Sequence, residues 1–146
     1  MWRKLLATPD DWVSLVARLG LGLVMFPHGA QKMLGWFGGY GFHGTLQFFT
    51  GPMHLPALLG VLAILAEFLG SLGLIAGLLG RIAAFGIGCN MVAAVLMVHG
   101  QNGFFMDWGG NQKGEGFEYH ILALTLVIIV LVRGSGKASL DRVLSA

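Results

Sequence analysis

The sequence predicts an all-α fold, an integral membrane four-helix bundle formed by a single transmembrane domain that spans residues 1–146. Long apolar stretches fill most of the chain, and only 11% of its residues are charged, against roughly 25% in a soluble domain. So little charge suits a surface that faces lipid. The apolar stretches are continuous rather than alternating, which excludes a β-barrel and leaves helices as the only membrane-spanning backbone.

Each apolar stretch is long enough, or nearly so, to cross a hydrocarbon core of about 30 Å at a rise of about 1.5 Å per residue. We expect the spans at residues 12–34, 55–79, 81–99 and 116–132. Pro56 suits the first turn of the second span. A tight turn at Gly80–Arg81 separates the second span from the third.

Two long connections, residues 35–54 and 100–115, are rich in glycine and aromatic residues. Within the first connection, Phe42 to Thr50 could form a short interfacial helix with its aromatic side chains at the level of the lipid headgroups. We expect the second connection to form a compact cap or a re-entrant turn.

The distribution of basic residues predicts the orientation of the chain. On one side of the membrane we expect Arg3, Lys4, Arg18, Arg81, Arg133, Lys137 and Arg142, and on the other side Lys32 and Lys113. Because lysine and arginine are retained on the cytoplasmic side, both termini should be cytoplasmic and both long connections outside. The same bias accounts for the net charge of +2, so no nucleic-acid partner is expected.

Polar side chains are expected inside the bundle at Arg18, Glu67 and Asn90. A lone charge in lipid is costly, so such residues pair with one another or line a cavity. The helical rise places Arg18 and Glu67 at nearly the same depth, which predicts an ion pair, hydrogen-bonded to Asn90. This pair would serve either as a structural clamp or as a proton-carrying or ligand-binding group.

All five histidines fall near span ends on the expected outer side. The candidate ligand-binding residues at that level are His28, Lys32, His99, Glu118 and His120. We expect His28, His99 and His120, with Glu118, to gather around one outward-facing pocket. These histidines are candidate ligands for zinc, copper or iron, and they could instead exchange protons with a quinone. A plainer alternative is that they are hydrogen-bonded interfacial histidines.

Glu118 and His120 are two residues apart, so they point to opposite faces of a regular helix. If only one of them points inward, we expect it to be His120. The single cysteine, Cys89, lies inside an apolar stretch and is expected to act as a small buried hydrophobic residue.

With these residues in place, the chain resembles the DoxX family of small four-helix bacterial membrane proteins. The matching segments are Arg18–Gly22, Pro27–Lys32, Trp36–Gly41, Leu65–Gly70, Gly77–Ala84, His99–Gly100, Gly103–Phe105, Gly116–His120 and Ser139–Asp141, which together run along nearly the whole chain. The resemblance implies a bacterial membrane redox role, since the family's namesakes are linked to a thiosulfate:quinone oxidoreductase. Other members resemble membrane partners of superoxide-detoxifying and sulfur-transferring proteins. No catalytic residue set is carried over.

The leading functional hypothesis is an inner-membrane subunit of a redox system that binds a quinone or small redox ligand at the outer half of the bundle. One alternative is a protein that binds or transports a metal ion or small molecule. The other is a non-catalytic membrane anchor for a redox partner complex. No motif for covalent cofactor attachment such as CxxCH is present, so a bound cofactor would be non-covalent. The partners considered are the lipid bilayer, a redox protein and a second copy of the chain in a homo-oligomer.

The orientation predicts that cysteines placed at positions 40 and 110 react with a membrane-impermeant thiol reagent from outside intact spheroplasts. Both positions lie in the long connections that are expected to face outward. Labelling that appears only after permeabilisation would reverse the orientation.

Overall fold

The computed structural model describes residues 5–145, and the regular structure in this range is helical throughout, which confirms the all-α expectation. The long helices are α2 (Trp12–Leu34), α4 (Ala57–Ala76), α5 (Gly80–Met97) and α6 (Glu118–Arg133). The short ones are η1 (Trp36–Gly38), α3 (Gly41–Thr50), η2 (His99–Asn102) and α7 (Leu140–Ser145). Arg3 and Lys4, which contribute to the orientation argument, lie outside the described residues.

Within the described residues, α2, α4 and α5 are long and apolar enough to cross a membrane. The remaining long helix, α6, has 16 residues and is therefore about 24 Å long. The four-helix membrane bundle is thus confirmed in part: a long helix exists near each expected span, and three have the length and composition of a membrane span. The expected short helix at residues 42–50 is present as α3.

The ends of the helices differ from the expected bounds for local reasons. α4 ends at Ala76, three residues early, because Gly77 adopts a left-handed conformation with φ of 67° and closes the helix. α6 begins at Glu118, two residues late, because the N–H groups of Gly116 and Phe117 pair with carbonyl oxygens of the preceding loop. α5 ends at Met97, so the segment that follows it turns separately as η2.

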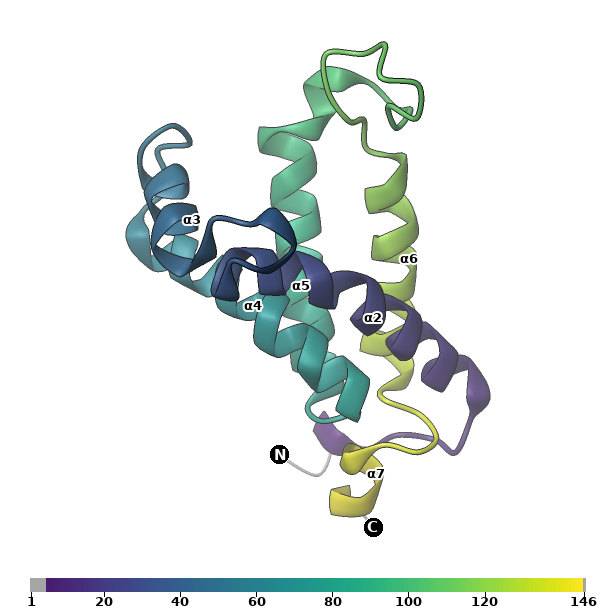
Figure 1. Ribbon diagram of the computed structural model, residues 1–146. Helices are drawn as coiled ribbons and strands as arrows, with labels where there is room; N and C mark the ends of the chain where they lie inside the picture. Colours follow the sequence, from purple (N-terminus) through teal and green to yellow (C-terminus); the bar gives the residue numbers. More distant parts are fainter. Residues whose placement is uncertain (1–4, 146) are drawn as a thin grey trace.

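The long helices form two pairs that cross each other (Figure 1). In that view α2 and α4 lie in front of α5 and α6, and a core that includes Leu21, Leu74, Ile87 and Val127 fills the contact. α5 and α6 continue to the loop 103–117, away from α3. We call the end with the α4–α5 turn, residues 134–145 and the start of α2 the closed end. The end with α3, η2 and the loop 103–117 is the open end.

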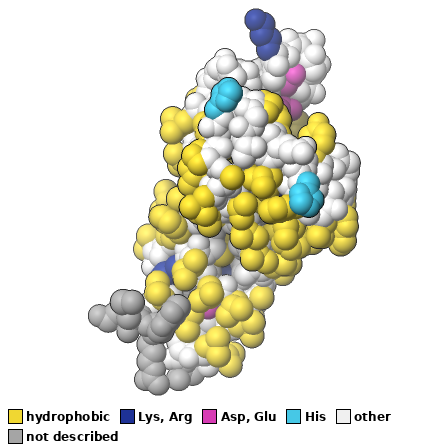
Figure 2. Space-filling view, turned by 90° about the vertical axis from the view of Figure 1, so that its left-hand side faces the viewer, with side chains coloured by type: hydrophobic (Ala, Val, Ile, Leu, Met, Phe, Trp, Pro, Cys, Tyr) yellow, Lys and Arg dark blue, Asp and Glu magenta, His cyan; other side chains and the backbone are white. Residues whose placement is uncertain are grey.

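The outer surface carries apolar side chains over most of the side on which α3 lies, and few charged ones (Figure 2). Large hydrophobic side chains are exposed on every long helix, as on Val16 of α2, Leu58 of α4, Phe85 of α5 and Leu122 of α6. A contiguous apolar surface of this kind suits contact with lipid. The chain is therefore a multi-pass membrane protein.

Arg18 does not form the ion pair with Glu67 that its depth suggested. Its guanidinium, 1% exposed, instead donates hydrogen bonds to five backbone carbonyl oxygens at the closed end. These belong to Leu74 (2.7 Å), Ile75 (2.8 Å), Ser135 (2.7 Å), Lys137 (3.2 Å) and Ala138 (2.6 Å). The last carbonyls of α4 have no partner within the helix and form the negative end of its dipole, so they attract a cation without any carboxylate.

Asp141 holds the α4–α5 turn from the other side. Its carboxylate accepts hydrogen bonds from the backbone N–H groups of Leu79 (2.6 Å) and Gly80 (2.9 Å) and from the Ser135 hydroxyl (2.6 Å). Leu79 has a φ of 53°, a conformation that costs a non-glycine residue of order 1–3 kcal/mol. The buried carboxylate therefore caps α5 and holds a strained turn in place.

Two further side chains close the ends of α6 and α2. The Arg81 guanidinium donates to carbonyl oxygens at the end of α6 and in residues 5–7. Asp11 accepts from the Ser14 N–H at 2.8 Å as the N-cap of α2, and this hydrogen bond is the main reason why the pKa of Asp11 is lowered. Arg133 lies 3.3 Å from the same carboxylate. Polar side chains thus fasten every long helix that terminates at the closed end.

Replacing Arg18 by alanine is expected to lower the free energy of unfolding by about 3 kcal/mol, because several buried carbonyls lose their donor. The effects of Arg18→Ala and Glu67→Gln on the free energy of unfolding should be additive within about 0.5 kcal/mol, because the two residues share no hydrogen-bond partner. Unfolding in mild detergent measures both effects. The control is Arg133→Ala, which removes the exposed Arg133–Asp11 ion pair and should cost about 0–1 kcal/mol. A strong coupling between Arg18 and Glu67 would contradict the structure.

Candidate functional site

A cavity of about 460 Å³ lies at the open end, where the two helix pairs diverge. Helices α2, α3, α4, α5 and α6 all contribute to its wall, together with the loop 103–117. Its volume falls within the range of about 300–1,000 Å³ that is typical of small-molecule sites. Of the five candidate ligand-binding residues, His28, Lys32, His99 and His120 line this cavity and Glu118 does not.

The deep end of the cavity carries an ion pair that the sequence analysis missed. Lys32 Nζ lies 2.6 Å from Glu67 Oε2, and the Glu67 side chain is 8% exposed. Asn90 Nδ2 donates to Glu67 Oε1 at 3.4 Å and to the Ala63 carbonyl oxygen at 2.8 Å. The expected contact between Glu67 and Asn90 therefore exists, but the cation is Lys32 rather than Arg18.

Gly29 explains why Lys32 can reach Glu67. A Cβ atom at position 29 would lie 2.7 Å from the backbone of Phe68 and 2.8 Å from the carbonyl carbon of Glu67. The absence of a side chain therefore allows α2 and α4 to approach closely at this level. Lys32 follows one turn later on α2, so its ammonium group folds onto the Glu67 carboxylate.

The rim of the cavity is formed by aromatic and histidine rings. The His99 and His120 ring centroids are 4.3 Å apart, and the His28 ring lies 6.4 Å from that of Tyr119. His99 Nδ1 is 2.8 Å from the Glu115 carbonyl oxygen. Since a carbonyl can only accept, Nδ1 of His99 carries the proton and its Nε2 is left as an acceptor.

His120 is 5% exposed, and its Nδ1 is fully buried with no hydrogen-bond partner. An unsatisfied buried acceptor costs less than an unsatisfied buried N–H in an apolar site, so we assign the proton to Nε2. The expectation that His120 rather than Glu118 points inward is confirmed. His120 therefore brings a hydrogen-bonding nitrogen to the cavity wall.

Glu118 serves the outer loop instead of the cavity. Its Oε1 accepts hydrogen bonds from the Met106 N–H at 3.0 Å and from the Trp108 Nε1–H at 3.3 Å. On α6 it points away from His120, as the spacing of two residues implies. The carboxylates that line the cavity are Glu67 and Glu115.

The described residues contain no group of three or more His, Cys, Asp or Glu side chains close enough to hold a metal ion. His28, His99 and His120 therefore share a cavity but are not grouped closely enough to be three ligands of one ion in this arrangement. Cys89 is exposed rather than buried, which corrects the expectation from its apolar surroundings. Its position on α5 places it on the outer surface of the helix.

Methionines line the cavity in a proportion that the sequence analysis did not anticipate. The cavity contains Met25, Met53, Met91, Met97 and Met106. The chain has seven methionines, so most of them meet here although they are far apart in sequence. Unbranched, polarisable thioethers form an adaptable apolar wall.

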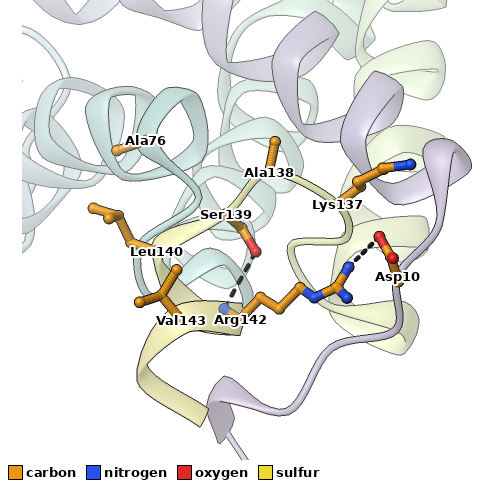
Figure 3. A pocket seen from close by; sticks show the side chains of 8 residues that line it. All are labelled: Asp10, Ala76, Lys137, Ala138, Ser139, Leu140, Arg142 and Val143. Carbon is orange, nitrogen blue, oxygen red and sulfur yellow. Dashed lines mark hydrogen bonds and ion pairs between the residues drawn. The ribbon is translucent and has the colours of Figure 1, made fainter. Parts of the chain in front are cut away.

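Two other hollows offer less chemistry. The closed end has one of about 630 Å³ beside α7, but there Arg142 is paired with Asp10 (Figure 3). The Lys137 ammonium lies 4.5 Å from the centroid of the Trp12 ring. A groove along α4 and α5 is lined only by apolar residues and glycine. Among these three, only the open-end cavity has a buried charged side chain, Glu67, in its wall.

A family model described as DoxX matches residues 13–100, more than half of the chain. The chain belongs to the DoxX family. The match extends from α2 into η2, so it includes Lys32, Glu67, Asn90 and His99, whereas α6 of this DoxX protein lies beyond it. Comparisons with curated proteins and with solved structures found no match.

The Lys32–Glu67 pair makes a prediction about stability. Lys32→Met should lower the free energy of unfolding by about 2 kcal/mol, because it leaves Glu67 as an uncompensated charge. The double variant Lys32→Met with Glu67→Leu should lose less stability than the sum of the losses in the two single variants. Lys113→Met, in the exposed loop, is the matched control. Additive effects in detergent unfolding would show that the pair is not coupled.

Proposed function

We propose that this DoxX protein is an inner-membrane subunit of a bacterial redox system and that its open-end cavity binds a quinone or a small redox ligand of similar chemistry. Both termini would then face the cytoplasm, with the cavity toward the outer side. The observation that carries the proposal is an apolar cavity at the ends of the membrane helices that holds three histidines and a buried Glu67 carboxylate paired with the half-buried Lys32 and Asn90.

The donors in the cavity fit the carbonyl oxygens of a quinone. The Lys32 ammonium has three N–H groups, and among the described residues Glu67 is its hydrogen-bond acceptor. On the opposite wall, His120 offers a ring nitrogen. A quinone ring carries two acceptor oxygens on opposite sides, so it can use donors that approach from both walls.

The titratable groups also fit a ligand whose reduction takes up protons. A quinone gains two protons when it gains two electrons, and histidine and glutamate side chains can exchange protons with it. Electrons would pass to or from a redox partner protein. The exposed aromatic side chains of the loop 103–117, such as Trp108 and Phe105, are a surface on which such a partner could dock.

The alternatives draw less support from the site. A metal-binding or metal-transport role requires ligands in a compact group, and residues 5–145 contain no such group of His, Cys, Asp or Glu. A purely anchoring role does not require a cavity, whereas here the Lys32–Glu67 pair, which is costly within a membrane, lies in a cavity wall.

The test is mass spectrometry and elemental analysis of protein extracted in mild detergent, followed by binding of a benzoquinone with a decyl side chain. We expect a co-purified quinone and saturable binding that His120→Ala weakens about tenfold through the loss of one hydrogen bond. His43→Ala, an exposed histidine outside the cavity, is the control and should leave affinity unchanged.

Stoichiometric metal without quinone would support the metal alternative and contradict the proposal. A stable protein complex with neither quinone nor metal, and no saturable quinone binding, would support the anchor.

A further inference from the structure

We infer that the open-end cavity opens sideways into the bilayer between α3 and α5, and that its ligand is a lipid-dissolved quinone whose long apolar side chain leaves through this gap. The inference rests on the proposed function and narrows it, because a water-soluble redox ligand would need no such opening. We call the gap the lateral portal and define it by Phe48, Phe49, Ala93, Ala94 and Met97.

On α5, the cavity wall passes without interruption from the polar end to the outside of the molecule. Asn90, Ala94 and Met97 lie at intervals of four and three residues, so they share one face of the helix. Asn90 contacts Glu67 at the deep end, whereas Met97 is 43% exposed. Ala93, one position to the side, lines the cavity and is exposed as well.

The opposite wall of the portal comes from α3. Phe48 and Phe49 line the cavity, and Phe48 is 48% exposed. Side chains that belong both to the cavity wall and to the outer surface mark openings of the cavity. The exposed Glu115 marks a second, polar opening beside the loop 103–117, whereas the opening between α3 and α5 is apolar. The side chains that define the portal are all apolar. The side of the molecule that carries α3 shows many apolar side chains and few charged ones, besides two histidines (Figure 2).

The positions of the polar groups give the ligand an orientation. Lys32 and Glu67 lie at the deep end, and His99 and His120 lie on the wall formed by α6 and η2, away from α3. A polar ring bound there has its apolar side chain directed toward the portal. The side chain then stays in lipid, where it needs neither a long protein tunnel nor transfer into water.

Portal variants test the inference with two quinones that share one ring, a dimethoxy-methyl-benzoquinone without a side chain and the same ring with a decyl chain. Ala94→Trp narrows the portal and should weaken binding of the decyl quinone about tenfold, equivalent to the lost burial of about two methylene groups, and leave the chainless ring nearly unaffected. Val92→Trp, on the exposed side of α5 and outside the cavity, is the control.

The two proposals fail in different ways in this experiment. If the wild-type protein binds neither quinone saturably, the proposed function fails. If it binds both and Ala94→Trp weakens both equally, the portal is wrong and the proposed function stands.

A second measurement uses the unaltered protein and so does not depend on a variant that folds. The probe is the same benzoquinone with a photoreactive diazirine at the fourth carbon of its side chain. We expect adducts on peptides that contain Phe48–Phe49 and Ala93–Met97, suppressed by excess decyl quinone. Competed adducts confined to α6 or to the loop 103–117 would overturn the portal.

Discussion

The arrangement of the helices depends on the hydrogen bonds that the Arg18 guanidinium donates to backbone carbonyl oxygens. One side chain of α2 binds the last turn of α4 and the segment 135–138 at the same time. Leu74 and Ser135 are buried within the protein, so water does not reach their carbonyl oxygens. An arginine with five donors in a planar fork satisfies groups that would otherwise remain unpaired. Together with Asp141 and Arg81, Arg18 connects the helix ends at the closed end through hydrogen bonds to the backbone.

Because the helices are fastened at one end, they are free to diverge at the other. α2 and α4 approach each other closely at Gly29. The α2–α4 pair diverges from α5 and α6 toward the open end. The cavity occupies the space that this divergence leaves. The buried polar contacts that hold the helix ends together therefore lie at the closed end, and the proposed binding site lies at the open end.

The helices could be predicted well because a long apolar stretch is a strong signal. The cavity histidines could be predicted because they lie at span ends on the same expected side of the membrane. The predicted Arg18–Glu67 ion pair was wrong, because pairing opposite charges leaves out the backbone carbonyl oxygens at a helix end as partners of Arg18. Depth arithmetic on untilted helices placed Glu67 opposite Arg18, whereas the actual stagger places it opposite Gly29. The methionine-lined wall of the cavity and the proposed portal depend on which residues lie close together in the folded chain, so no local sequence pattern could reveal them.

The methionine wall has a consequence for the chemical durability of the protein. Oxygen transfer to a thioether gives a sulfoxide, which is polar and chiral, so an oxidant that reaches the exposed Met97 makes the apolar lining of the cavity more polar. Enzymatic reduction of the sulfoxide restores the apolar surface. Oxidative stress would thus modify the lining of the cavity reversibly. The polar contacts of the closed end use arginine, aspartate and backbone groups, which do not undergo this reaction.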